Sequence, residues 1–375
     1  MSDSSVDVGH LAATFAVAPP AVLPALGRHA HQQHLDALAV HLSELQAWLA
    51  DDLRAVEEAL RTPQGTTLAE RAGRHLLQAG GKRIRPLCTL LAGHMGGAPA
   101  PRGIRDLAIA VELVHNATLL HDDVVDLADT RRGRPTARAL HGNEVSIFAG
   151  DWVLVAALRR IVGSGFPGLV DSALDTLEAM IAAEVEQAQR AQVCAGDVEG
   201  YFRVAGGKTA SLFRWAMRAG ATAAGLGHDE CEALQTFGGE LGVAFQITDD
   251  AIDLEGDPAA TGKALFADLC EGKVTLPVAL ALAVQPGLRD QLVDLRAAAN
   301  AVAVTTAVHN DEGAALVARC AGIARAVADC GGLEAARTEA RTRCDKALAA
   351  LQVVRACPER EALRAVAGAM VRRRA

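Results

Sequence analysis

Residues 121–126 spell His-Asp-Asp-Val-Val-Asp and residues 245–253 spell Phe-Gln-Ile-Thr-Asp-Asp-Ala-Ile-Asp, so the pattern Asp-Asp-x-x-Asp occurs twice. Each copy ends an apolar run with helical spacing. Side chains four positions apart lie about 5–6 Å from each other on one helix face, where like charges destabilise a bare helix. We therefore predict that both motifs bind a cation. Carboxylate oxygens without nearby cysteines favour a hard ion such as Mg²⁺, which keeps waters and accepts phosphate oxygens as further ligands.

Helical periodicity extends well beyond these two runs. Apolar residues recur three and four positions apart from about residue 34 onward, and glycine-rich breaks separate the segments. No alternating pattern typical of strands persists. The clearest helical segments are 104–126, 144–162, 170–192, 208–224, 230–253, 274–284 and 313–329. We predict an all-α fold of roughly ten or more helices in one domain, residues 36–375, after a loosely ordered extension, residues 1–35.

Composition excludes several classes of function. The chain has 375 residues, a net charge of −8 and only 3% aromatic residues, which argues against a nucleic-acid partner. The six motif aspartates account for much of the negative excess. Eight cysteines are scattered without a Cys-x-x-Cys pair, which favours reduced thiols. Because no secretory signal is present and no apolar run reaches about 18 residues, we expect a soluble, cytoplasmic protein without a transmembrane segment.

Basic clusters accompany the aspartate motifs. Residues 80–86, Gly-Gly-Lys-Arg-Ile-Arg-Pro, combine two glycines with three cations whose converging donors suit a diphosphate. Arg131 and Arg132 follow the first motif, and Lys208-Thr209 precede the second. Each cluster alone equally fits a solvated turn, a local ion pair or a surface residue.

Further polar residues lie close to the motifs in sequence. His115 is about two turns before Asp122 on a similar face of its helix, although a lone histidine there is usually a satisfied core residue. His121 and Gln246 flank the two motifs as candidate hydrogen-bond partners. Lys263 and Lys273 follow the second motif.

The order of these motifs resembles the trans-prenyl diphosphate synthase family over about residues 40–300. The resemblance implies the isoprenoid-synthase helical bundle with a central substrate cavity, usually as a homodimer. It further implies an enzyme that condenses isopentenyl diphosphate with an allylic diphosphate, head to tail, with the help of three Mg²⁺ ions.

The resemblance also implies a role for each matched residue. Asp122, Asp126 and Asp249 would ligate the metals directly, with Asp123, Asp250 and Asp253 in support. The residues matched to the allylic diphosphate are Arg131, Lys208, Thr209, Gln246 and Lys263. Those matched to isopentenyl diphosphate are Lys82, Arg85, His115 and Arg132. Lys273 matches a cation whose role is less defined.

Product length depends on the floor of the pocket for the growing chain. We expect this floor about one turn before the first motif, at Ala117 and Thr118, which are both small. No Phe, Tyr or Trp occurs from Leu107 to His121, and the motif has no insertion. Short-chain relatives block this place with a bulky side chain, so we favour a long all-trans product of about six to ten isoprene units. Leu113, Val114 or a neighbouring helix could instead form a deeper floor.

Several other functions stay open at this point. A short-chain farnesyl or geranylgeranyl diphosphate synthase is the first alternative. A terpene cyclase would normally replace the second aspartate motif and lack the isopentenyl site. A non-catalytic partner subunit could lose aspartates freely, yet all six are present. A di-iron carboxylate bundle would need Glu-x-x-His pairs.

Overall fold

The aspartate motifs end two long helices, α6 (Ile104–Val125) and α12 (His228–Glu255). The structure is a computed structural model, and it describes residues 49–61, 67–97, 103–255, 266–304 and 310–371. The predicted extension over residues 1–35 therefore lies outside the described residues. α6 is buried over most of its circumference, because apolar residues occur on every side of the helix and polar residues are few. It ends at Asp126, after which Leu127 has the left-handed backbone angle φ of 52°.

Helices make up nearly all of the described chain, as predicted. Besides α6 and α12 they are α3 (Ala50–Arg61), α4 (Leu68–Gln78), α5 (Ile84–His94), α7 (Ala137–His141), α8 (Asn143–Gly163), α9 (Gly168–Gln192), α10 (Val198–Ala205), the π-helical turn η1 (Gly206–Ala210), α11 (Ser211–Ala223), α14 (Ala267–Cys270), α15 (Leu276–Val284), α16 (Leu288–Val304), α17 (Asn310–Asp329), α18 (Gly332–Ala350) and α19 (Pro358–Val371).

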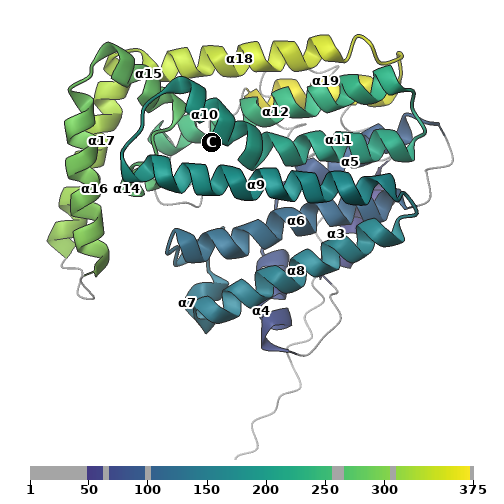
Figure 1. Ribbon diagram of the computed structural model, residues 1–375, viewed down its shortest axis with the longest axis horizontal. Helices are drawn as coiled ribbons and strands as arrows, with labels where there is room; N and C mark the ends of the chain where they lie inside the picture. The colour runs from purple at the N-terminus through teal and green to yellow at the C-terminus, as the bar shows by residue number, and fades with distance from the viewer. Residues whose placement is uncertain (1–48, 62–66, 98–102, 256–265, 305–309, 372–375) are drawn as a thin grey trace, which may run out of the picture.

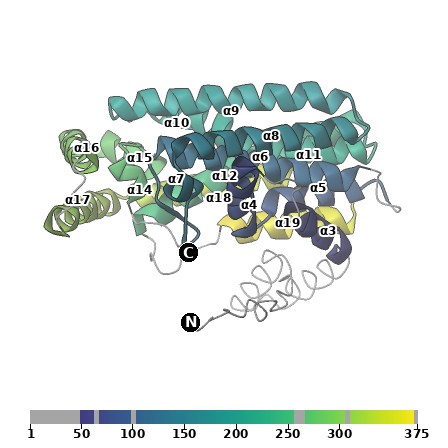
Figure 2. The same ribbon diagram turned by 90° about the horizontal axis from the view of Figure 1, so that it is seen from below.

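The long helices lie side by side along the longest axis of the molecule (Figure 1). α6 packs against α8 and α5, α11 packs against α5 and α12, and α12 packs against α18. α16 and α17 form a pair at one end, across the direction of the others, and are seen nearly end-on in Figure 2. This arrangement makes α6 and α12 two inner helices that are covered by their neighbours.

Two glycines on α12 allow α11 to pack closely. A Cβ at Gly238 would lie 2.6 Å from the carbonyl oxygen of Phe213, and one at Gly242 would lie 2.6 Å from the Cα of Ala210. Since real side chains do not tolerate such distances, only glycine fits at these adjoining turns of the helix. The close packing holds the last turns of α12, with the second aspartate motif, against the segment that contains Lys208.

A small hairpin departs from the all-helical prediction. β1 (Thr130–Arg131) pairs antiparallel with β2 (Arg134–Pro135), and these are the only strands among the described residues. The two residues between them, Arg132 and Gly133, both have positive φ, at 52° and 70°. A two-residue turn of this kind matches the twist of paired strands. It folds the chain back beside the end of α6.

The apolar core has one large part and two smaller ones. The large cluster joins α3–α9, α11, the first half of α12, the end of α18 and most of α19. A second cluster lies among α14, α15, α16 and α17, and a third surrounds Tyr201 and Ile247. Within the described ranges, no helix has both the length and the hydropathy needed to cross a bilayer.

Candidate active site

The first aspartate motif is held in place by an arginine of the hairpin. Asp123 is only 1% exposed, and its Oδ1 accepts a hydrogen bond from Nε of Arg131 at 2.6 Å. Burial raises the pKa of Asp123, and the charge of Arg131 partly offsets that effect. Its Oδ2 is buried without a hydrogen-bond partner among the described residues. A buried carboxylate with one unsatisfied oxygen is a costly arrangement that a cationic ligand would relieve.

Asp122, on the same turn, is close enough to Lys208 of η1 and Glu184 of α9 for their charges to act on it. Burial raises the pKa of Asp122 to about 6, and the cation Lys208 works against this shift while Glu184 and Asp126 add to it. Nζ of Lys208 lies 2.8 Å from Glu184 and donates to Oε1 of Gln187, also at 2.8 Å. Both partners of the lysine belong to α9. The first motif therefore shares its surroundings with a lysine that two side chains hold in position.

The second motif is held by a chain of hydrogen bonds. Asp250 is 3% exposed and accepts from the hydroxyl of Tyr201 at 2.6 Å and from Nε2 of Gln246 at 2.8 Å. The hydroxyl of Thr209 in turn donates to Oε1 of Gln246 at 2.6 Å. Burial raises the pKa of Asp250 to about 8, with Asp268 as a further cause. Thr209 and Gln246, both predicted as site residues, thus meet at the second motif.

The segment after the second motif returns to the first. Nζ of Lys273 donates to Oδ1 of Asp126 at 3.1 Å and pairs with Glu271. Burial works to lower the pKa of Lys273, but Glu271, Asp268 and Asp126 outweigh it and raise that pKa. Asp253 also holds this segment, because its carboxylate accepts from the backbone N–H groups of residues 267 and 268 at 3.3 and 3.4 Å. Lys263 lies outside the described residues.

Arg85 is in the first turn of α5, close enough to the second motif for the charge of Asp249 to act on it. Its guanidinium carbon is 4.5 Å from the centre of the Phe213 ring, and its Nε is buried without a hydrogen-bond partner in the described chain. Burial lowers the pKa of Arg85, while the charges of Glu112 and Asp249 oppose that change. A desolvated guanidinium with an unused donor is suited to an anionic ligand. Lys82, on the same turn, is exposed.

His115 is surrounded by positive charge. Its pKa lies well below the usual value because of burial and because of Arg85, Arg132, Arg131 and Arg83, in that order. The histidine is therefore neutral. Arg83 and Arg131 pair with carboxylates, whereas Arg85 and Arg132 have no ion pair among the described residues and therefore suit a diphosphate.

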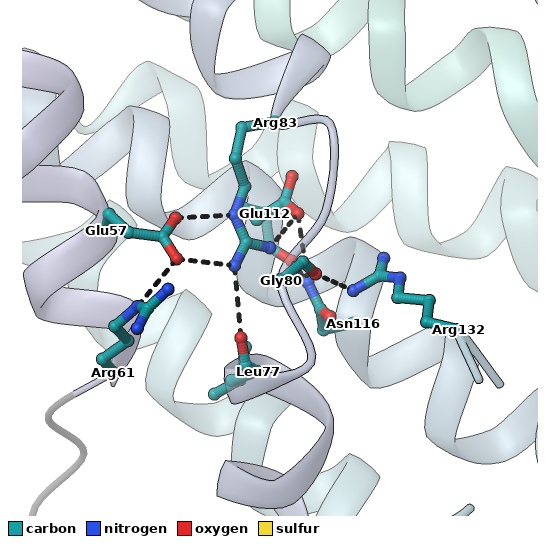
Figure 3. Close-up of polar contacts among 8 residues, drawn as sticks. All are labelled: Glu57, Arg61, Leu77, Gly80, Arg83, Glu112, Asn116 and Arg132. Atoms are coloured by element: carbon teal, nitrogen blue, oxygen red, sulfur yellow. Dashed lines mark hydrogen bonds and ion pairs between the residues drawn. The ribbon is translucent and has the colours of Figure 1, made fainter. Parts of the chain in front are cut away.

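Two residues behave differently from the sequence interpretation. Arg83 had been grouped with the converging cations of its turn, but it points into the protein and pairs with Glu57 and Glu112 (Figure 3). That interpretation was wrong for Arg83, because buried carboxylates on two other helices attract it more strongly than solvent does. His121 turns toward α8, where its Nε2 lies 3.2 Å from the carbonyl oxygen of Ile147.

The two residues proposed as the pocket floor belong to α6, before the first aspartate motif. Ala117 is 2% exposed and belongs to the large apolar cluster. Thr118 is half-buried, and its hydroxyl donates to the carbonyl oxygen of His115 at 2.8 Å. Ala117 is thus part of the helix packing, and its role as a pocket floor stays a prediction.

Some residues around the motifs were missed from the sequence. Tyr201 could have been found, because it is the only tyrosine in the chain. Glu184, Gln187 and Glu112 carry no such signal, since helices rich in glutamate and glutamine usually expose them to solvent. Their importance follows only from their contacts with Lys208 and Arg83.

The carboxylates of the first motif suit a metal ion that takes most of its ligands from water and phosphate. Across the described residues, no three His, Cys, Asp or Glu side chains come together as a ready-made metal site. Mg²⁺ usually keeps several waters and binds through one or two carboxylates plus phosphate oxygens. Asp122 and the unsatisfied Asp123 suit such an ion. All eight cysteines are free thiols, as predicted.

Solved structures define the class of this fold. A polyprenyl synthase from Caulobacter crescentus CB15, crystallised with calcium and isoprenyl diphosphate, superposes with a TM-score of 0.78 at 32% identity, covering 94% of this chain and 98% of that one. A decaprenyl diphosphate synthase from Rhodobacter capsulatus gives a TM-score of 0.73 at 33% identity, covering 88% and 98%. The predicted isoprenoid-synthase helical fold is confirmed.

Sequence comparisons define the family. The polyprenyl synthetase family model matches residues 66–310. Octaprenyl diphosphate synthase of Escherichia coli strain K12 is 35% identical over 343 residues, which are 89% of this chain and 99% of that protein. Heptaprenyl diphosphate synthase component 2 of Geobacillus stearothermophilus is 41% identical over 244 residues, 64% of this chain and 76% of that protein. The chain belongs to the polyprenyl synthetase family, as its motifs predicted.

Proposed function

We propose that this protein is a Mg²⁺-dependent trans-prenyltransferase that condenses isopentenyl diphosphate with an allylic diphosphate to a long all-trans polyprenyl diphosphate. The observation that carries the proposal is the meeting of two aspartate motifs with two groups of cations. Lys273 joins the segment after the second motif to Asp126 of the first. The charge of Lys208 acts on Asp122 of the first motif, and the charge of Asp249 of the second motif acts on Arg85.

Each substrate would take one group of cations. Lys208, Thr209 and Gln246, with Arg131 and Lys263, would hold the allylic diphosphate. Lys82, Arg85, His115 and Arg132 would hold isopentenyl diphosphate, where the unused Nε–H of Arg85 gains a partner. The neutral His115 can donate or accept one hydrogen bond without adding another charge to the arginines.

Asp122, Asp126 and Asp249 would hold Mg²⁺, three ions by family resemblance, with Asp123, Asp250 and Asp253 in support. When bound, such ions neutralise the charge that develops on a departing diphosphate. The hydrogen bonds from Tyr201 and Gln246 fix Asp250, so the carboxylates of α12 keep their geometry while charge moves. The Caulobacter relative was solved with calcium and isoprenyl diphosphate, which supports a divalent cation and a diphosphate at this place.

The chemistry needs no further catalytic base. The allylic C–O bond breaks, the electron pair leaves with diphosphate, and Lys208 with Arg131 stabilises the departing charge. The double bond of isopentenyl diphosphate attacks the allylic cation, and the leaving diphosphate accepts the proton that is lost. Apolar residues of α6 exclude the water that would otherwise capture the cation.

A long product is supported by the relatives and by the small side chains on α6. Relatives at 34–41% identity include heptaprenyl, octaprenyl and nonaprenyl diphosphate synthases. Geranylgeranyl diphosphate synthases from Lactobacillus brevis and Pyrococcus horikoshii also share the fold, at 26% identity. A short-chain synthase is therefore the second candidate, which product analysis distinguishes.

A homodimer would cover an exposed apolar surface on α8 and α9. Phe148, Val155 and Val162 recur every seven residues and are 62%, 48% and 66% exposed. Ile181 and Val185 of α9 are 65% and 53% exposed. Such stripes usually mark a contact with another chain. The name "component 2" of the Geobacillus relative makes a different partner chain the alternative.

The dimer is tested with one substitution and a matched control. Light scattering after gel filtration should show a dimer for the wild type and a monomer for Ile181→Glu. Val317 on α17 is 55% exposed and outside the stripe, so Val317→Glu should stay dimeric. A monomeric wild type, or a dimeric Ile181→Glu variant, would reject this interface.

The activity is tested with the purified chain alone. We expect diphosphate release only when Mg²⁺, an allylic diphosphate and isopentenyl diphosphate are all present, and its loss on adding a chelator. Release from the allylic substrate alone would indicate a cyclase. No turnover in any combination would indicate a partner subunit. The cytoplasmic location and the single domain over residues 36–375 stay predictions.

A further inference from the structure

Arg83 uses four of its five N–H donors in hydrogen bonds to protein partners. Its Nε lies 3.0 Å from Oε2 of Glu57, its Nη1 lies 2.7 Å from Oε1 of Glu112, and its Nη2 donates to the carbonyl oxygen of Leu77 at 3.2 Å (Figure 3). The residue is 3% exposed. Although it stands between Lys82 and Arg85 in sequence, all three of its guanidinium nitrogens already have an acceptor. Arg83 therefore has a different task from its neighbours.

The two carboxylates that hold Arg83 come from different helices. Glu57 on α3 is 4% exposed and also accepts from Nε of Arg61 at 3.0 Å. Burial alone would raise the pKa of Glu57, but Arg83 and then Arg61 outweigh it and lower that pKa, so the carboxylate stays charged. Glu112 on α6 is 3% exposed and accepts from Nδ2 of Asn116 at 3.3 Å. The three charges join α3 and α6 through the turn before α5.

The Gly80–Gly81 turn is clamped between two arginines. Nη1 of Arg132 donates to the carbonyl oxygen of Gly80. A Cβ at Gly81 would lie 3.2 Å from Nη1 of Arg83 and 3.2 Å from Nη2 of Arg132, so both guanidinium groups touch the same glycine. Arg83 and Arg132 also have left-handed φ angles of 51° and 52°, which non-glycine residues keep only where surrounding contacts enforce them.

The negative charge of Glu112 acts on three of the arginines around His115. Glu112 lies one helical turn before His115 on α6, and its charge supports the protonated forms of Arg83, Arg85 and Arg132. Arg85 keeps a buried Nε without a hydrogen-bond partner among the described residues. Arg83 is thus an arginine whose three guanidinium nitrogens all have protein acceptors, whereas Arg85 has a nitrogen without one.

We propose that the buried chain Glu57–Arg83–Glu112 is a positioning device for isopentenyl diphosphate. Arg83 does not touch the substrate. It fixes the Gly80–Gly81 turn, and through that turn it sets the places of Arg85 and Arg132. The inference deepens the proposed function and rests on it.

The test separates positioning from stability with four proteins: wild type, Arg83→Met, the double variant Arg83→Met/Glu112→Gln, and the control Arg61→Met. Arg83→Met leaves Glu112 buried without a cation, which destabilises the fold. The double variant removes that charge, and Glu57 still has Arg61. Isothermal titration calorimetry measures isopentenyl diphosphate binding, thermal unfolding measures stability, and steady-state kinetics give both KM values.

We expect Arg83→Met to weaken isopentenyl diphosphate binding by about tenfold or more. The allylic KM and kcat at saturating substrate should stay within about twofold. The double variant should recover much of the lost thermal stability but not the affinity. Arg61→Met should bind isopentenyl diphosphate like the wild type, because it leaves both contacts of Arg83 in place.

Three results would overturn the inference. The first is a double variant whose affinity returns together with its stability, since Arg83 would then be purely structural. The second is a crystal structure with isopentenyl diphosphate in which a nitrogen of Arg83 contacts the ligand. The third is a wild type that does not bind isopentenyl diphosphate at all, which would reject the proposed function as well.

Discussion

Replacing Tyr201 with phenylalanine tests how the second aspartate motif is held. The substitution removes only the hydroxyl, which donates to Oδ2 of Asp250 at 2.6 Å. The ring stays in its contact with Phe202, where the two centres are 5.5 Å apart in an edge-on arrangement. No cavity larger than one oxygen is created, so any change in function comes from the lost hydrogen bond.

The magnitude follows from the kind of bond that is lost. A hydrogen bond to a charged acceptor contributes about 1.5–3 kcal/mol, and a neutral pair contributes about 0.5–1.5 kcal/mol. The first range applies to the metal-bound enzyme, where Mg²⁺ beside the motif would keep Asp250 ionised, and it predicts a fall in kcat/KM of roughly ten- to a hundredfold for Tyr201→Phe. Thr209→Val breaks the neutral bond to Gln246 further along the same chain, so the smaller range applies to its effect on stability.

The assay is diphosphate release at varied substrate concentrations, together with urea unfolding of the metal-free protein. Because the pKa of Asp250 is about 8, this carboxyl is largely protonated in the metal-free protein at neutral pH, and Tyr201→Phe should lower the free energy of unfolding by about 0.5–1.5 kcal/mol. The variant should also reduce kcat/KM for both substrates. A variant that loses stability but keeps wild-type kcat/KM would refute the claim that Tyr201 positions Asp250 for catalysis. A variant that loses neither would refute the contact itself.

The other predictions concern the metal-binding aspartates, the isopentenyl diphosphate site, the pocket for the growing chain and the hydroxyl of Tyr201. Asp122→Ala or Asp249→Ala should lower turnover by several orders of magnitude at saturating Mg²⁺ with an unchanged helical circular dichroism spectrum, and near-normal turnover would exclude the metal assignment. Arg85→Ala should raise the isopentenyl KM by roughly ten- to a hundredfold and the allylic KM less, and equal effects would reject the division of sites. Ala117→Phe should shorten the product in chromatography of the extracted lipids, and an unchanged product would move the floor elsewhere. In an alkaline titration followed by phenolate absorbance, Tyr201 should stay neutral above its ordinary pKa of about 10 until the chain unfolds, because burial and then Asp250 raise its pKa. Ionisation near that ordinary value in the folded chain would contradict its burial.

The long helices could be predicted from the sequence because their packing faces are periodic. The predicted segments 144–162, 170–192 and 230–253 correspond to α8, α9 and α12 with ends that differ by only a few residues. The hairpin after α6 could not be predicted in this way, since strands of two residues are too short to show alternation. Likewise, the C-terminal third had no recognisable motif, yet α18 packs along α12.

The site could be predicted as a set of residues but not as a set of contacts. The repeated aspartates and the flanking cations were visible because their types and spacing are unusual. The direction of Arg83 was not, because its partners lie 26 and 29 residues away in sequence. The contact of Lys273 with Asp126 spans 147 residues. Such pairs depend on how helices pack, which no local pattern encodes.

The central claim is that this chain makes a long polyprenyl diphosphate, and product analysis tests it most directly. The purified protein would be incubated with Mg²⁺, isopentenyl diphosphate and, in separate reactions, geranyl, farnesyl or geranylgeranyl diphosphate, and the products identified by mass spectrometry. We expect isopentenyl units to be added one at a time and all-trans chains of more than five units to accumulate. Products that stop at three or four units, or a cyclised hydrocarbon formed without isopentenyl diphosphate, would contradict it.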